Sequence, residues 1–169
     1  MEQRELQLSS LIRATIFVRN LEKATAFYRA LGFEETYLDM VLDHPSASQV
    51  IGLPQHHPYP ARILKQPGPN FGMLGLFELS PAQGAAEVDR GDGAARIGEV
   101  ALVFYVRSLE RTLPLLERAG ARWMPDPQTF QMGDFSVRET CVRDCDGTLL
   151  SLIERPPEDQ LRTTPPPVS

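Results

Sequence analysis

The three histidines of this sequence are its clearest candidates for acid–base chemistry, and all of them fall within residues 43–60. That segment is rich in proline, serine and glycine, so we expect a loop, with His44 early in it. Adjacent residues of an extended segment point to opposite sides, so at most one of His56 and His57 can face a cleft. In a loop that covers a cleft either could act as an acid–base group, whereas at the surface both would be solvated.

The two cysteines, Cys141 and Cys145, lie beside the sequence DCDG at residues 144–147, which reads as a turn. With the first in a strand and the second in the turn after it, their geometry does not favour a disulfide. No second cysteine or histidine pair accompanies them, as a zinc site would require. We therefore expect two free thiols and a reducing, cytoplasmic compartment.

Composition narrows the classes of partner. The chain has 169 residues, a formal net charge of −5 and scattered basic residues, so we expect no nucleic-acid partner. Hydrophobic residues make up 42% of the chain, enough for a globular interior. No apolar run approaches the ~20 residues of a membrane span, and the first ten residues lack the pattern of a signal peptide.

An internal repeat positions the remaining candidates. Residues 12–32 and 100–120 match without a gap. The matched residues include Val18 with Val106, Arg19 with Arg107, Leu21 with Leu109, Glu22 with Glu110 and Gly32 with Gly120. Each copy predicts an apolar strand, a polar N-cap residue (Asn20 or Ser108), an amphipathic helix and a terminal glycine.

The rest of the chain completes two modules of one strand, one helix and three strands. The expected strands of the first module are residues 11–19, 33–41, 59–66 and 72–79. Those of the second are residues 98–106, 121–125, 137–143 and 148–154, with Pro114 inside the second helix. The expected organisation is a polar lead (1–10), a first module (11–80), a linker (81–96), a second module (97–155) and a disordered, proline-rich tail (156–169).

This organisation, with the opening VRNLEKATAFYRALGF and the turn DCDGTLL, resembles the vicinal oxygen chelate superfamily over about residues 11–155. The superfamily includes glyoxalase I, bleomycin-resistance proteins and extradiol dioxygenases. The resemblance implies an α+β fold of two βαβββ modules, each a curved sheet with a helix on its convex face. It also implies a homodimer and a cleft for a small molecule, but no particular reaction, since very different chemistries share this scaffold.

The resemblance further implies four metal-ligand positions, two for histidines and two for acidic residues. These positions fall on Arg13, Ala101, Glu78 and Ser151. Only Glu78 suits a divalent cation, because arginine stays protonated, alanine has no donor atom and serine is a poor ligand. We therefore expect neither a divalent metal nor another cofactor.

Arg13 and Glu78 are expected to share an inward face, either as a partly buried ion pair or as a functional pair. In the functional alternative Arg13 holds an anionic or carbonyl group, and Glu78 serves as acceptor or general base. Strand alternation adds the inward-facing candidates Thr15, Phe17, Leu76, Val103, Tyr105, Leu149 and Ile153. Ala101, Ser151 and His57 complete the predicted ligand-binding set.

Two main functions remain open. One is a metal-independent protein that binds a small apolar or aromatic molecule in the concave cleft. The other is an isomerase, lyase or dioxygenase-like enzyme of the superfamily. It would use Glu78 with Arg13, or a rearranged metal site drawn from His56, His57 and Glu99. An interaction module without a ligand is a third interpretation, so whether the chain is an enzyme stays open.

Overall fold

The computed structural model describes residues 9–133 and 135–154. The chain divides into two compact units. The first comprises the chain through Thr25 together with Gly32–Glu87, and the second comprises Ala26–Leu31 and the chain from Val88 onward. Helix α1 (Leu21–Ala30) therefore contributes its first half to one unit and its second half to the other.

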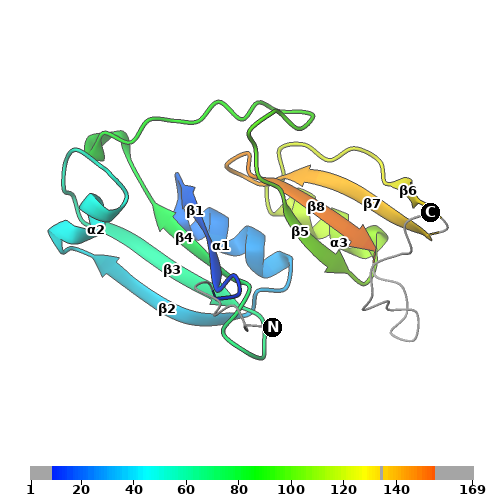
Figure 1. Cartoon of the computed structure of the whole chain (residues 1–169), viewed down its shortest axis with the longest axis horizontal. Coiled ribbons are helices and arrows are strands. Elements are labelled where there is room, and N and C mark those ends of the chain that lie inside the picture. Colours follow the sequence, from blue (N-terminus) through cyan, green and yellow to red (C-terminus); the bar gives the residue numbers. More distant parts are fainter. Residues whose placement is uncertain (1–8, 134, 155–169) are drawn as a thin grey trace, which may run out of the picture. The chain divides into compact units, whose positions relative to one another are not determined.

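The first unit is built on a four-stranded sheet in the order β1-β4-β3-β2 (Figure 1). Its strands are β1 (Arg13–Val18), β2 (Glu35–Leu42), β3 (Tyr59–Lys65) and β4 (Met73–Glu78). β1 and β4 are parallel, whereas β4, β3 and β2 are successively antiparallel. The first and last strands of the module are thus neighbours, and everything between them forms the crossover that a parallel pair needs.

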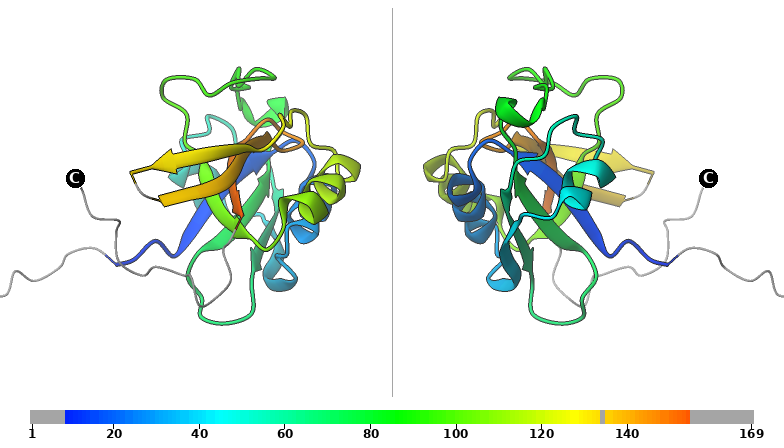
Figure 2. Two further views of the ribbon diagram at one scale, coloured as in Figure 1. Left: turned by 90° about the vertical axis from the view of Figure 1, so that its right-hand side faces the viewer. Right: turned by 90° about the vertical axis from the view of Figure 1, so that its left-hand side faces the viewer.

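The second unit repeats this topology in the order β5-β8-β7-β6. Its elements are β5 (Leu102–Val106), α3 (Leu109–Arg118), β6 (Gln128–Met132), β7 (Phe135–Arg143) and β8 (Leu149–Glu154). β5 and β8 are parallel, and α3 lies along one face of this sheet (Figures 1 and 2). The predicted α+β fold of two βαβββ modules with curved sheets is confirmed.

One face of each sheet is buried. In the first sheet Ile16, Val18 and Leu74 expose 5%, 2% and 1% of their surface, whereas Phe17 exposes 46%. The alternation predicted for β1 is therefore confirmed. In the second sheet Leu150 and Leu152 are fully buried. Apolar side chains on the covered faces of both sheets supply the cores.

Both repeated helices begin at a carboxylate from the last strand of the same module. The backbone N–H of Leu21 donates to Oε2 of Glu78 at 2.7 Å, and that of Leu109 donates to Oε1 of Glu154 at 2.9 Å. The predicted N-caps add a second bond each, from the Lys23 N–H to Asn20 and from the Arg111 N–H to Ser108. Each module therefore satisfies two of the free amide groups at its helix start in the same way.

Three local predictions need correction. The loop expected over residues 43–60 contains helix α2 (Pro45–Val50). The strand expected at residues 121–125 is absent: Trp123 forms only an isolated bridge to Arg143, and the second strand of the module is β6. β5 begins at Leu102, later than expected.

Short connections complete the described part of the chain. A 3-10 turn, η1 (Pro81–Gln83), follows β4. The predicted tail, residues 156–169, and most of the predicted lead lie outside the described residues. None of the helices in residues 9–133 and 135–154 is long and apolar enough to cross a membrane.

Candidate functional site

The face of the first sheet opposite Ile16 and Leu76 carries Arg13 above an aromatic ring. The guanidinium carbon of Arg13 lies 5.8 Å from the centroid of the Phe77 ring. Its Nε donates to Oγ1 of Thr15 at 3.2 Å. Phe17 packs edge-on against Phe77, with centroids 6.2 Å apart. Among the described residues no carboxylate forms an ion pair with Arg13, so its charge is not neutralised within this part of the chain.

Glu78 lies on the opposite face of the same sheet, so the expected shared face of Arg13 and Glu78 is wrong. In the parallel register Val18 pairs with Glu78 and Arg13 pairs with Met73. Side chains alternate along a strand, so positions 13 and 18 point to opposite sides. Glu78 binds the start of α1. It therefore forms neither the ion pair nor the catalytic pair with Arg13 that the sequence suggested.

Leu76 lies on the same covered face of the first sheet as Glu78. It pairs with Ile16 in the register and is fully buried. The expectation that Leu76 lines the cleft beside Thr15 and Phe17 is therefore wrong, for the same reason of strand phase. Thr15 and Phe17 do share the face of Arg13, since they alternate with Ile16 along β1.

The corresponding face of the second sheet carries exposed apolar side chains and one polar pair. Val103 and Tyr105 expose 59% and 65% of their surface. They pair with Ser151 and Ile153 of β8, so these four side chains share a face. Oγ of Ser151 donates to Oε1 of Glu139 across the sheet. Glu139 is not among the residues that the sequence predicts for this face.

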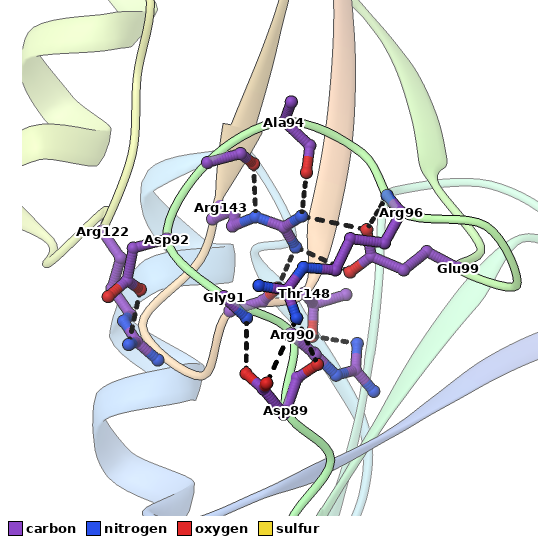
Figure 3. Close-up of polar contacts among 12 residues, drawn as sticks. Asp89, Arg90, Gly91, Asp92, Ala94, Arg96, Glu99, Arg122, Arg143 and Thr148 are labelled. Carbon is purple, nitrogen blue, oxygen red and sulfur yellow. Dashed lines mark hydrogen bonds and ion pairs between the residues drawn. The ribbon is translucent and has the colours of Figure 1, made fainter.

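A loop binds Arg143, the last residue of β7. Figure 3 shows the chain from Arg90 to Glu99 passing around the Arg143 guanidinium, which is fully buried. Both Glu99 oxygens accept from Arg143, at 2.8 and 2.9 Å. The carbonyl oxygens of Gly93, Ala94 and Gly147 accept the other three bonds, at 2.8, 3.0 and 2.8 Å. All five N–H donors of the guanidinium are therefore used.

The positions of three candidate residues, Glu99, Leu149 and Ala101, can now be given. Arg143 and the backbone N–H of Arg96 hydrogen-bond Glu99 and lower the pKa of this carboxyl to about 2. Glu99 is thus part of the loop anchor rather than available to a rearranged metal site with His56 and His57. Leu149 pairs with Arg143 and exposes only 3% of its surface. Ala101 precedes β5 and is exposed.

The two adjacent histidines have different surroundings. His56 uses both ring nitrogens: Nδ1 lies 3.1 Å from Oγ of Ser48, and Nε2 lies 2.7 Å from the carbonyl oxygen of Asp43. These bonds hold the end of the loop to its start at Asp43 and to Ser48 of α2, so His56 acts structurally here. His57 is exposed, and its carbonyl oxygen accepts from Nε2 of Gln83.

The DCDG turn encloses a second buried polar group. The hydroxyl of Tyr28 donates to Oδ2 of Asp144 at 2.6 Å, and Oδ1 accepts the backbone N–H groups of Asp146 and Thr148. Burial raises the pKa of Asp144. Burial also raises the pKa of the Cys145 thiol to about 12 and that of Cys141 above its usual value. Both cysteines are free thiols, and neither is activated as a nucleophile.

Comparison with known proteins decides the family. A family model described as the Glyoxalase/Bleomycin resistance protein/Dioxygenase superfamily matches residues 10–152. The chain belongs to this superfamily. A search of the curated proteins finds no significant match.

Solved structures agree on the fold of this superfamily member. A glyoxalase family protein from Bacillus cereus matches with a TM-score of 0.66 at 17% sequence identity, over 90% of this chain and 97% of that one. A mutant glyoxalase I from Zea mays matches with a TM-score of 0.56 at 16% identity, over 86% of this chain and 44% of that one. Identities this low support the shared fold and carry no activity across.

The internal repeat corrects the position of one metal-ligand slot. Ser151 pairs with Val103, and the residue equivalent to Val103 in the first module is Thr15, which pairs with Gly75. The structural counterpart of Ser151 is therefore Gly75 rather than Glu78. Glu78 instead corresponds to Glu154, which caps the second helix as Glu78 caps the first.

The side chains at the four slots do not fit a divalent metal. They are Arg13, Gly75, Ala101 and Ser151. One is a cation, two have no donor atom, and Ser151 donates its hydroxyl hydrogen to Glu139. Within residues 9–133 and 135–154 no three His, Cys, Asp or Glu side chains cluster closely enough to hold a metal ion. We derive no chemical step through a metal.

Proposed function

We propose that this chain binds a small organic anion with an apolar or aromatic body on the face of β1 and β4 that carries Arg13 and Phe77, without a divalent metal. The observation that carries the proposal is Arg13, which lies over Phe77 and has no carboxylate partner among the described residues. The bond to Thr15 uses Nε and orients the side chain, while no described residue bonds its two Nη groups. Such a planar fork matches a carboxylate or phosphate group.

The neighbouring aromatic rings supply the apolar part of the proposed site. Phe17 exposes 46% of its surface beside Phe77. A planar ligand can stack on these rings while its anionic group meets Arg13. The donor set at the four slots supports the metal-independent part of the proposal, since Arg13 would repel a cation there.

Calorimetry with the full chain tests the proposal. Benzoate and phenyl phosphate are the probes, and benzyl alcohol is the neutral control. Loss of a charge-assisted bond should weaken benzoate binding about tenfold or more in Arg13→Gln, with Arg13→Lys intermediate. Arg107→Gln, at an exposed arginine, is the matched control and should bind as the wild type does.

Three outcomes would contradict the proposed function. They are equal benzoate affinity in Arg13→Gln and wild type, equal binding of benzyl alcohol and benzoate, and no binding of either anion. Stoichiometric uptake of manganese, iron, nickel or zinc, with an anion affinity that chelator abolishes, would contradict its metal-independent part.

We also propose that the chain forms a homodimer. Edge strand β2 exposes three large apolar side chains, Tyr37, Met40 and Val41, at 52%, 47% and 54%. An exposed apolar edge of this kind favours association. Light scattering at several concentrations should give twice the mass of one chain, and Val41→Lys should give a monomer. A wild-type monomer at every concentration would contradict this.

The proposed compartment is the cytoplasm, in keeping with the two free thiols. With a formal net charge of −5, we expect no nucleic-acid partner. Fractionation of the producing cells tests the first point, and titration with a labelled duplex at low salt tests the second.

A further inference from the structure

The uncovered face of the second sheet contains a carboxylate that has no counter-ion. Oε1 of Glu139 accepts the hydroxyl hydrogen of Ser151, which exposes only 5% of its surface. Among the described residues no arginine, lysine or histidine forms an ion pair with Glu139. The nearby Arg143 is occupied by Glu99 and by backbone carbonyl groups. The charge of Glu139 is therefore not neutralised within the described chain.

The neighbours of Glu139 on this face of the sheet are uncharged side chains. Along β7 it alternates onto the same side as Cys141, and it pairs with Ile153 in the register. The Cys141 thiol has its pKa raised, first by burial and then by the Glu139 carboxylate. Apolar neighbours weaken the solvation of a carboxylate and strengthen its attraction for a cation.

The same face offers apolar surface for the rest of a ligand. Val103 and Tyr105 of β5 pair with Ser151 and Ile153, and they are 59% and 65% exposed. A tyrosine ring with an open face can stack on an aromatic group or attract an organic cation. A carboxylate fixed by a serine and bordered by such surface complements a molecule with one ammonium group and an apolar body.

We propose that Glu139, held by Ser151, is the recognition residue of a second small-molecule site that binds organic amines beside Tyr105 and Val103. One oxygen of Glu139 is oriented by Ser151, and the other accepts from the ammonium group of the ligand. Ser151 is a positioning residue. This site does not depend on the anion site at Arg13, because its residues belong to the other unit.

The test is titration of the full chain with benzylamine at pH 7 and low ionic strength, where charge attraction is least screened. Glu139→Gln keeps the size of the side chain and removes its charge, so benzylamine affinity should fall about tenfold. Ser151→Ala keeps the charge and releases its orientation, so a smaller loss is expected. Benzyl alcohol has the same ring without the charge and should bind more weakly than benzylamine.

Glu117→Gln is the matched control, because it removes one exposed carboxylate of the second unit with the same chemical change. Its benzylamine affinity should equal that of the wild type. The proposal is overturned by no binding of benzylamine, by equal binding of benzyl alcohol, or by equal losses in Glu139→Gln and Glu117→Gln. The benzoate titration of Arg13→Gln is read separately and is unaffected by these outcomes.

A direct measurement guards against a variant that fails to fold. In the NMR spectrum of the wild type, benzylamine should shift the methyl signals of Val103 and Ile153. Shifts confined to other parts of the chain would overturn the assignment of the site. The melting temperature of each variant shows whether a loss of binding reflects a loss of fold.

Discussion

Arg143 and Glu99 form a bidentate ion pair in which the guanidinium has no exposed surface, with bond lengths of 2.8 and 2.9 Å. Loop residues Gly93 and Ala94 add two backbone bonds to the same guanidinium. A segment whose composition indicates a flexible linker is therefore fixed to the second sheet at its C-terminal end. The anchor is a side chain 44 residues further along the chain.

Glu99→Gln should destabilise the protein strongly. A neutral amide leaves the buried Arg143 charge uncompensated, and breaking such a pair from one side costs about 3 kcal/mol or more of unfolding free energy. Urea denaturation at pH 7 measures the change, with Glu117→Gln as the exposed control. A loss below about 0.5 kcal/mol, typical of a surface substitution, would show that the pair does not anchor the loop.

Acid should remove the same stabilisation. The folded-state pKa of Glu99 is about 2, below the ordinary value of 4.5, so the unfolded chain binds this proton more readily. The stabilisation is present above pH 4.5 and is lost as the pH falls toward 2. Asp144, whose pKa is raised by burial, acts in the opposite sense over its own range. Urea denaturation across this window should show a shallower acid loss in Glu99→Gln than in the wild type.

Glu78→Gln and Glu154→Gln should have parallel effects, because both carboxylates cap a repeated helix. Each should lower the free energy of unfolding by about 1 kcal/mol. Glu154→Gln should cost slightly more, since Glu154 also pairs with Arg138 at 3.2 Å. Chemical denaturation gives both values. Because Glu78 faces away from Arg13, Glu78→Gln should keep wild-type affinity for benzoate, and a tenfold loss would contradict the placement of these two residues.

Gly75→Ala should disturb the anion site without breaking the strand. A Cβ at this position would lie 3.0 Å from Cδ of Arg13 and 3.2 Å from Oγ1 of Thr15, and its backbone φ is not positive. Arg13 must shift from Phe77, so its guanidinium is no longer held where it meets the anionic group of the ligand. The dissociation constant for benzoate should rise about two- to fivefold.

The control for this substitution is Gly93→Ala, where an added Cβ meets nothing within 4 Å. Calorimetry should give wild-type benzoate affinity for Gly93→Ala. Unchanged affinity in Gly75→Ala would mean that the position of Arg13 over Phe77 does not matter for binding.

The repeat and the helix boundaries were predictable because their signals are local. Asn20 and Ser108 cap the helices at the expected positions, and the alternation around Ile16 identifies the covered face of β1. A strand carries its own period of two, and a cap acts within one helical turn. These features need no knowledge of which strands become neighbours.

The candidate site depended on non-local information. Whether Glu78 faces Arg13 is set by the register of a parallel pair whose strands are separated by α1, β2, α2 and β3. A change of one residue in phase moves a side chain to the other face. Consecutive residues of β4 are buried, so the alternation of this strand alone does not identify its phase. Glu139 could have been found by applying strand alternation from Cys141, which lies two residues away on β7.

The hydrogen bond between Tyr28 and Asp144 affects how the chain folds during its synthesis. The hydroxyl of Tyr28 donates to Asp144, 116 residues later, and residues 26–31 belong to the unit whose other residues are made last. A nascent chain that has only reached the end of β4 can pair its first four strands, but its helix still lacks the Asp144 acceptor. Folding of the N-terminal half on the ribosome is thus completed only when the DCDG turn emerges. Genetic separation of the halves at residue 88 would leave the second product without residues 26–31, which belong to its unit.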